Sequence, residues 1–114
     1  RNSGWQSNTA LYLLNMKPKS EWVLVDFYGI LEPGLLCLSH TNDATTAEGE
    51  IISLHQGMVL TAFDLDTDEN GNPDNVFASG VVEKSPEYAQ YKGSLWSLRI
   101  DSDGIRHESD IKQA

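Results

Sequence analysis

Short apolar segments, separated by polar stretches rich in turn-forming residues, run through most of this chain and predict β-strands. The clearest case is Ser94–Ile100, in which Trp96, Leu98 and Ile100 fall on one face. This period of two is typical of a half-buried strand. The segments expected to form strands are Glu21–Tyr28, Leu35–Ser39, Glu50–Leu54, Met58–Asp64, Asn75–Lys84, Ser94–Ile100 and Ile105–Glu108.

Short strands at this close spacing predict a mainly β fold with a minor α contribution, either a small antiparallel barrel or a curled sheet. A chain of 114 residues is long enough for one core and too short for two domains. The expected core residues are Val23, Val25, Leu36, Leu38, Ile52, Met58, Leu60, Val81, Trp96, Leu98 and Ile100.

Glycine and polar residues indicate where these strands turn. Asp103 and Gly104 predict a hairpin whose returning strand is Ile105–Glu108. Thr41–Gly49 is small and polar and predicts a loop. Gly80, inside a strand, predicts a bulge or a sharp bend of the kind found at barrel corners.

The first residues of the chain predict one short helix. Residues 1–7 are polar and predict a flexible N-terminus, and residues 8–114 predict a single small β-rich domain. Asn8 and Thr9 offer an N-cap for a helix over Ala10–Met16, which Pro18 would end. This helix and the long Thr41–Gly49 loop depart from a minimal barrel, so a meander or an α+β roll is an alternative.

The negative net charge of the chain disfavours some classes of binding partner. The chain has 17 acidic and 8 basic residues and a formal net charge of −9. Such a surface repels phosphate, which disfavours nucleic acid and anionic lipid. No apolar run approaches the roughly 18 residues needed to cross a bilayer, so no membrane partner is expected. The charge suits a basic protein partner, a cation or simple solubility.

The single cysteine bears on the cellular compartment. Cys37 excludes an internal disulfide and lies in an apolar segment, where it is expected to be a buried small hydrophobic residue. No apolar signal segment led by Lys or Arg opens the sequence. The expected location is therefore the cytoplasm.

An acidic run between two predicted strands is the main candidate for a metal site. Counted from Asp66, five positions resemble the calcium loop of EF-hand and related Asp-x-Asp-x-Asn-Gly proteins: Asp66, Asp68, Asn70, Gly71 and Asp74. The twelfth position, which should be a bidentate Glu, is Phe77, so any calcium site here should be weak. The alternative is a solvated hairpin with its turn at Asn70 and Gly71.

No catalytic residue is expected. His40, His55 and His107 lie on separate segments without a Cys or a second His at metal-ligand spacing. Cys37 has no obvious base in the sequence, and no nucleophile-elbow or phosphate-binding glycine pattern occurs.

Aromatic residues are the main candidates for a binding surface. Tyr88 and Tyr91 lie in a loop beside Pro86 and are expected to be exposed, and Trp96 follows on the next strand. Aromatic side chains of this kind line the grooves in which small barrels hold peptides or methylated side chains.

Three segments carry a resemblance to known proteins: Ser79–Glu83, Trp96–Asp101 and Arg106–Ile111. They resemble the closing strands of small Tudor-type or Src-homology-type barrels. They are also similar to small bacterial orphan proteins of the kind carried on mobile gene cassettes of integrons. The resemblance implies the fold and no particular activity.

Three functions follow as hypotheses. The first is a non-catalytic binding or adaptor module, with Tyr88 and Tyr91 in its contact surface and a protein or a second copy of the chain as partner. The second is an acidic inhibitor or immunity-type protein that covers a basic partner, with Asp64–Asp74 and Glu48–Glu50 as phosphate mimics. The third is a small enzyme or ligand carrier with a pocket inside the barrel. No cofactor is expected apart from weakly bound calcium.

Overall fold

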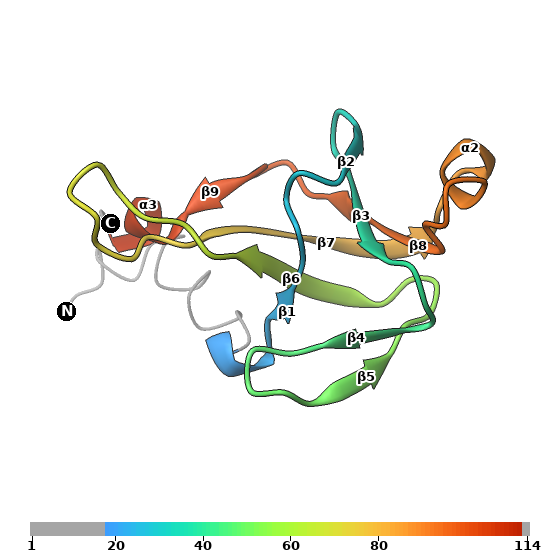
Figure 1. Ribbon diagram of the computed structural model, residues 1–114, viewed down its shortest axis with the longest axis horizontal. Coiled ribbons are helices and arrows are strands. Elements are labelled where there is room, and N and C mark those ends of the chain that lie inside the picture. Colours follow the sequence, from blue (N-terminus) through green and yellow to red (C-terminus); the bar gives the residue numbers. More distant parts are fainter. Residues whose placement is uncertain (1–17, 113–114) are drawn as a thin grey trace, which may run out of the picture.

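The computed structural model describes residues 18–112, whose main element is a seven-stranded sheet (Figure 1). Its strands lie in the order β1-β6-β7-β8-β3-β2, and β9 pairs with β7. Their bounds are β1 Val23–Leu24, β2 Ile30–Glu32, β3 Leu35–Ser39, β6 Val59–Asp64, β7 Val76–Lys84, β8 Trp96–Ile100 and β9 Arg106–His107. A separate hairpin holds β4 Asp43–Thr45 and β5 Ile51–Ser53.

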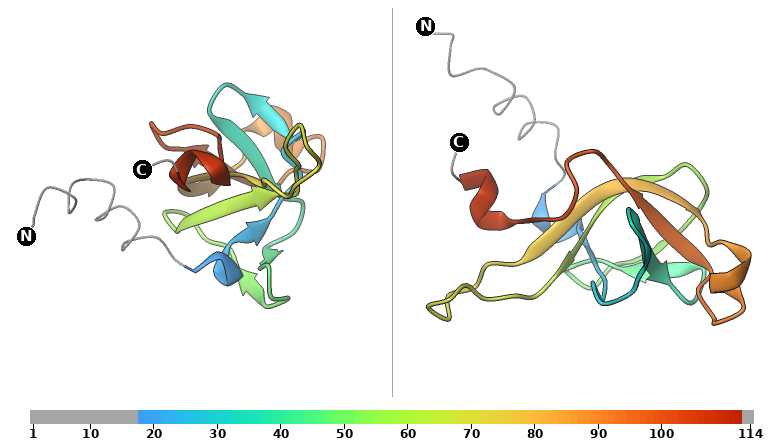
Figure 2. Two further views of the ribbon diagram at one scale, coloured as in Figure 1. Left: turned by 90° about the vertical axis from the view of Figure 1, so that its left-hand side faces the viewer. Right: turned by 90° about the horizontal axis from the view of Figure 1, so that it is seen from above.

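The sheet is mixed and curled, and among the described residues it does not close into a barrel (Figure 2). β1 runs parallel to β6, and the other strand pairs are antiparallel. The end strands β1 and β2 do not pair with each other. On its free side β1 meets the β4–β5 hairpin, because Val23 bridges Thr46 and the Ala47 N–H donates to the Trp22 carbonyl at 2.8 Å. The edge that would close a barrel is therefore occupied.

The described residues contain three short helices, and none of them is the N-terminal helix that the sequence predicted. They are the 3-10 helix η2 (Lys19–Glu21) and the α-helices α2 (Glu87–Gln90) and α3 (Glu108–Lys112). The helix expected over Ala10–Met16 and the flexible residues 1–7 lie outside the described residues.

The predicted strands are confirmed best in the second half of the chain. β6 and β7 lie within the predicted Met58–Asp64 and Asn75–Lys84. In the first half, the strand expected over Glu21–Tyr28 reduces to Val23–Leu24. The predicted loop Thr41–Gly49 contains β4. Strand β2 was not predicted.

The predicted hairpin at Asp103 and Gly104 is wrong. Of the residues of β7, only Gly80–Lys84 pair with β8, which leaves the start of β7 without a β8 partner on that edge. β9 fills this gap, with Val76 opposite His107 and Phe77 opposite Arg106. The chain therefore continues along β7 after β8 instead of turning back beside it.

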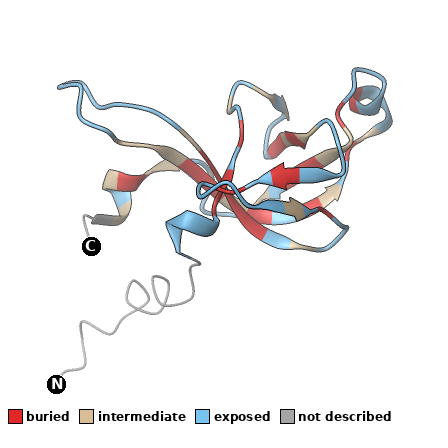
Figure 3. Ribbon diagram, turned by 60° about the horizontal axis from the view of Figure 1, so that its bottom comes forward, coloured by how far each residue is buried: buried red, intermediate tan, exposed pale blue. Residues whose placement is uncertain are grey.

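The main core lies on one face of the sheet, and buried positions gather along the central strands (Figure 3). Six expected residues are buried: Val23, Val25, Leu36, Leu38, Leu60 and Leu98. Four more pack against them while partly exposed: Ile52, Met58, Trp96 and Ile100. Val81 was wrongly assigned to the core. It is 41% exposed, because its neighbour Val82 occupies the inward position of β7.

A second, smaller cluster lies on the opposite face of β6 and β7. It contains Trp22, Phe63 and Phe77, with Ile111 of α3 packed against it. Trp22 stacks on Phe77 with 5.1 Å between ring centroids. Trp22 and Val23 are consecutive, so the start of β1 contributes to both clusters.

Gly80 is required by a close approach of two strands. It lies opposite Leu60 and Ile100, and the register is unbroken through both pairings, so there is no bulge at this position. A Cβ at Gly80 would collide with the backbone carbonyl of Arg99. Glycine therefore lets β7 and β8 approach where the sheet curls.

Candidate functional site

Exposed apolar and charged side chains form a row across the outer face of the sheet, the side opposite the main core. Val59 lies beside Val81, and Val81 lies beside Arg99, as direct cross-strand partners. Val59 is 64% exposed and Val81 is 41% exposed. We define the outer patch as this row with the side chains that fix its charged end: Val59, Val81, Arg99, Glu83, Tyr88 and Glu32.

Hydrogen bonds hold the charged end of the outer patch in place. Arg99 donates to Glu83 at 2.8 Å, and this bond raises the pKa of Arg99. Tyr88 donates its hydroxyl to Glu32 Oε1 at 2.6 Å, and this bond raises the pKa of Tyr88. Four elements, β2, β7, β8 and α2, therefore contribute to the charged end of the outer patch, and β6 contributes Val59 to its other end.

The short helix α2 positions the two tyrosines. Pro86 precedes its first residue, and Ala89 is buried while Tyr88 remains half-exposed. Tyr91 ends the helix and is 94% exposed. The structure thus brings Tyr88 and Tyr91 onto one helical turn, and the predicted exposure of both is confirmed.

Trp96, the third expected binding aromatic, lies elsewhere. It is on the core face of β8 and packs against the main cluster while partly exposed. Its indole N–H donates to Asn42 Oδ1 at 3.0 Å, and the Lys84 ammonium lies 5.9 Å from the ring centroid. The structure therefore does not bring Trp96 together with the tyrosines on the outer face.

The acidic run forms the hairpin between β6 and β7, with its turn at the predicted place. The Gly71 N–H donates to the Asp68 carbonyl at 3.0 Å, and Gly71 has a φ of +82°. Asp68 Oδ1 also accepts the N–H groups of Asn70 and Asn72, at 2.8 and 2.9 Å. Asp68 therefore caps its own turn, which explains its place in the sequence without a metal.

The other two aspartates of the expected calcium loop point to different partners. Asp74 accepts the N–H and the hydroxyl of Ser109 in α3, at 2.9 and 2.8 Å. Asp66 faces His107, with 2.8 Å between Oδ2 and Nε2. Within residues 18–112, no three His, Cys, Asp or Glu side chains gather as metal ligands. Weak calcium binding at Asp66, Asp68, Asn70 and Asp74 stays a prediction.

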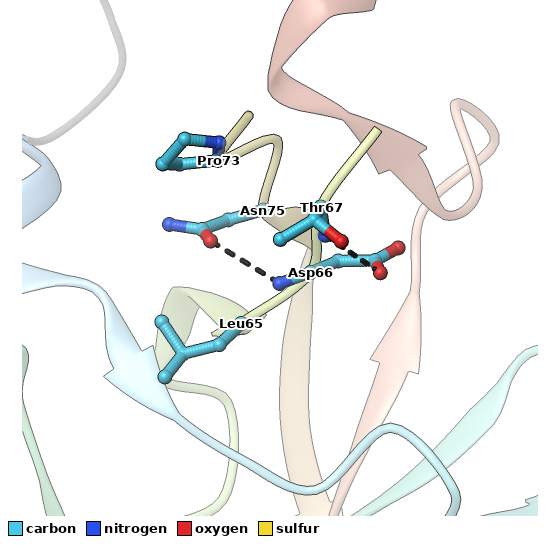
Figure 4. A pocket seen from close by; sticks show the side chains of 5 residues that line it. All are labelled: Leu65, Asp66, Thr67, Pro73 and Asn75. Atoms are coloured by element: carbon cyan, nitrogen blue, oxygen red, sulfur yellow. Dashed lines mark hydrogen bonds between the residues drawn. The ribbon is translucent and has the colours of Figure 1, made fainter. Parts of the chain in front are cut away.

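A shallow hollow opens at the base of this hairpin (Figure 4). It is lined by Leu65, Asp66, Thr67, Pro73 and Asn75. The Asp66 N–H donates to Asn75 Oδ1 at 3.3 Å, and Asp66 Oδ1 accepts the Thr67 N–H at 2.8 Å. Both bonds lie within the wall of the hollow and fix the position of Asp66 between Thr67 and Asn75.

The ion pair between His107 and Asp66 predicts a pH-dependent stability. The hydrogen bond to Asp66 raises the pKa of His107 above its ordinary value of 6.5. The same bond lowers the pKa of Asp66 below its ordinary value of 3.8. The His107 contribution is fully present below 6.5 and is lost as pH rises through the folded-state pKa. The Asp66 contribution is present above 3.8 and is lost as pH falls, so the pair should stabilise most between these values.

We expect Asp66→Asn to lower the pKa of His107, measured by proton NMR titration of its imidazole. The thermal midpoint of the wild type should also fall, relative to this variant, as pH rises above 6.5. The matched control is Asp68→Asn, since Asp68 bonds only its own turn. An equal effect of both variants on His107 would contradict the assignment.

Beneath α2 lies a polar cluster that sequence reasoning did not identify. Cys37 Sγ lies 3.9 Å from His40 Nε2 and accepts the Ser94 hydroxyl at 3.1 Å. Ser85 bonds Ser94 at 2.9 Å and Ser97 at 2.6 Å, and these three serines are buried.

Cys37 is half-buried, so its expected role as a buried small hydrophobic residue is wrong. Its side chain points away from the main core because Leu36 and Leu38 take the inward positions of β3. The available signal was the spacing Cys37-x-x-His40, which a strand end can bring together.

Comparison with known proteins adds no assignment, since no protein-family model, curated protein or solved structure matches the chain. Among the described residues, no helix has the length and apolar character that crossing a membrane requires.

Proposed function

We propose that this chain is a non-catalytic protein-binding module that binds through the outer patch. The observation that carries the proposal is the exposed cross-strand pair of Val59 and Val81 beside Arg99. Apolar side chains left in water on a sheet face gain free energy when a partner covers them. Tyr and Arg, together with Trp, are enriched at the energetic centres of protein interfaces.

The geometry of the outer patch also favours low-cost binding. Tyr88 is held by Glu32 and Arg99 is held by Glu83, so neither side chain must be ordered when a partner arrives. Fixing a flexible side chain at an interface costs about 0.5–1.5 kcal/mol, and fixing it beforehand avoids that cost. Tyr91, which is 94% exposed, ends the same short helix that carries Tyr88.

The partner is a protein, either another chain or a second copy that forms a homodimer by pairing the same patch about a two-fold axis. The setting is the cytoplasm, and neither nucleic acid nor a membrane surface is a partner.

A lysine at the centre of the outer patch tests this function. We expect Val81→Lys to weaken binding by about tenfold or more, because an ammonium would be buried in the contact. Peptides selected from a display library on the folded protein provide the probe. Sedimentation velocity measures self-association in parallel.

The matched control is Ile51→Lys on β5, which is 70% exposed and lies outside the outer patch. Loss of peptide binding or self-association in the Val81 variant alone would support the proposal. A monomer at all concentrations, with selected peptides that bind both variants equally, would overturn it.

A second candidate function is favoured by the distribution of charge. No lysine or arginine occurs between Lys19 and Lys84, while the β6–β7 hairpin holds Asp66, Asp68, Glu69 and Asp74. In Figure 1 this hairpin projects at the end of the molecule away from α2. Its carboxylates would mimic the phosphate groups that a basic partner binds. The binding would therefore weaken steeply as the salt concentration rises. Replacing Asp68 and Glu69 with their amides should then weaken oligolysine binding, and Val81→Lys should not.

A further inference from the structure

The hydrogen bonds around Cys37 form one directed chain, which begins at a backbone carbonyl. His40 Nδ1 lies 2.9 Å from the Gly93 carbonyl oxygen. A carbonyl only accepts, so Nδ1 carries the proton and donates it. The neutral imidazole then presents the lone pair of Nε2 toward Cys37 Sγ, 3.9 Å away. This is the arrangement of a nucleophile, a base and a group that orients the base.

The serine hydroxyls complete the chain on the other side of the sulfur. Ser94 donates its only hydroxyl proton to Sγ, so it accepts from Ser85, and Ser85 in turn accepts from Ser97. All three O–H groups therefore point along one path toward Sγ. Hydrogen bonds aligned in this way strengthen one another, and they stabilise negative charge at the end that accepts.

The residues around the sulfur differ in their exposure to solvent. Cys37 is half-buried, and the His40 beside it is exposed. The loop at Gly93 packs closely on the ring, since a Cβ there would lie 3.4 Å from His40 Nδ1. Hydrogen peroxide is a small, neutral oxidant of thiols. We propose that Cys37 is a nucleophilic thiol activated by His40, and that hydrogen peroxide oxidises it to a sulfenic acid.

The reaction balances with peroxide as the only co-reactant. His40 Nε2 takes the thiol proton, and the sulfur attacks one peroxide oxygen as the O–O bond breaks. The leaving hydroxide takes the proton back from Nε2 and departs as water. The sulfur loses two electrons, which the peroxide gains. These 114 residues contain no second cysteine, so the sulfenic acid cannot close a disulfide within them and awaits an external thiol.

The experiment measures the rate of Cys37 oxidation by hydrogen peroxide, with dimedone to trap the sulfenic acid and intact mass to count it. We expect the wild type to react about tenfold or more faster than His40→Ala. Cys37→Ser should give no adduct, which identifies the reacting atom. His55→Ala is the matched control, because His55 is another exposed histidine, on a different segment, and its removal should leave the rate unchanged.

Two further measurements distinguish whether His40 acts as a base or only supports the local structure. Imidazole added to His40→Ala should restore part of the rate, and it should not change the rate of His55→Ala. Ser94→Ala should also slow the reaction, because it removes the donor to Sγ. The proposal would be overturned if wild type and His40→Ala were oxidised at the same rate, and if that rate equalled the rate of the chain unfolded in urea. A rate in His40→Ala that imidazole does not raise would also overturn it.

Discussion

Replacing Phe77 with alanine is expected to lower the free energy of unfolding by about 4 kcal/mol, measured by urea denaturation. Phe77 is fully buried and stacks on Trp22. The Arg106 guanidinium lies 5.0 Å from the centroid of the same ring. The variant loses the transfer free energy of a phenyl ring and leaves a cavity between β7 and α3. A domain of this size is stable by about 5–15 kcal/mol, so a substantial part of its stability would be lost.

The matched control for this cavity is Tyr28→Ala, which removes an aromatic ring that is 96% exposed. We expect this control to change the free energy of unfolding by less than about 0.5 kcal/mol. A similar loss of stability in the two variants would show that the buried ring of Phe77 contributes no more to stability than an exposed ring.

Replacing Gly80 with alanine is expected to cost about 3 kcal/mol, at the high end for one added methyl group. The new Cβ would overlap the backbone carbonyl of Arg99, which is fixed in the β7–β8 ladder and cannot move like the end of a side chain. The strands would have to separate at the point where the sheet curls. Urea denaturation measures the loss, and the near-ultraviolet circular dichroism of Trp96 in β8 should change with it.

Val81→Ala is the control for Gly80→Ala, because Val81 is the next residue of the same strand and its side chain points to solvent. Its effect on the free energy of unfolding should stay below about 1 kcal/mol. Equal stability of Gly80→Ala and the wild type would mean that β7 and β8 do not approach as closely as the structure indicates.

The sequence predicts the strands that carry long regular patterns. β6, β7 and β8 have apolar runs bounded by turn residues, and their positions are confirmed. β2 and β4 are three residues each, too short for a period of two to be recognised. β9 was placed beside the wrong strand, because a local turn signal cannot show that β7 extends beyond the end of β8.

The candidate site could be predicted in part. Tyr88 and Tyr91 were expected at the surface because the residues around them are polar. Their setting depends on contacts distant in sequence, such as Tyr88 with Glu32, 56 residues apart. The same holds for Cys37 with Ser94, 57 residues apart. A one-residue error of phase, as at Val81, moves a side chain from the core to the outer patch.

The second cluster has a consequence for the order in which the protein folds. Trp22 lies near the start of the described chain and Ile111 near its end, and both are needed to cover Phe77. Lys19 joins Glu108 across the same gap in sequence, with 3.2 Å between Nζ and Oε2. Contacts between such distant residues close large loops and form slowly. During synthesis the main core can begin to assemble once β8 is made, whereas the second cluster stays incomplete until Ile111 of α3 has followed.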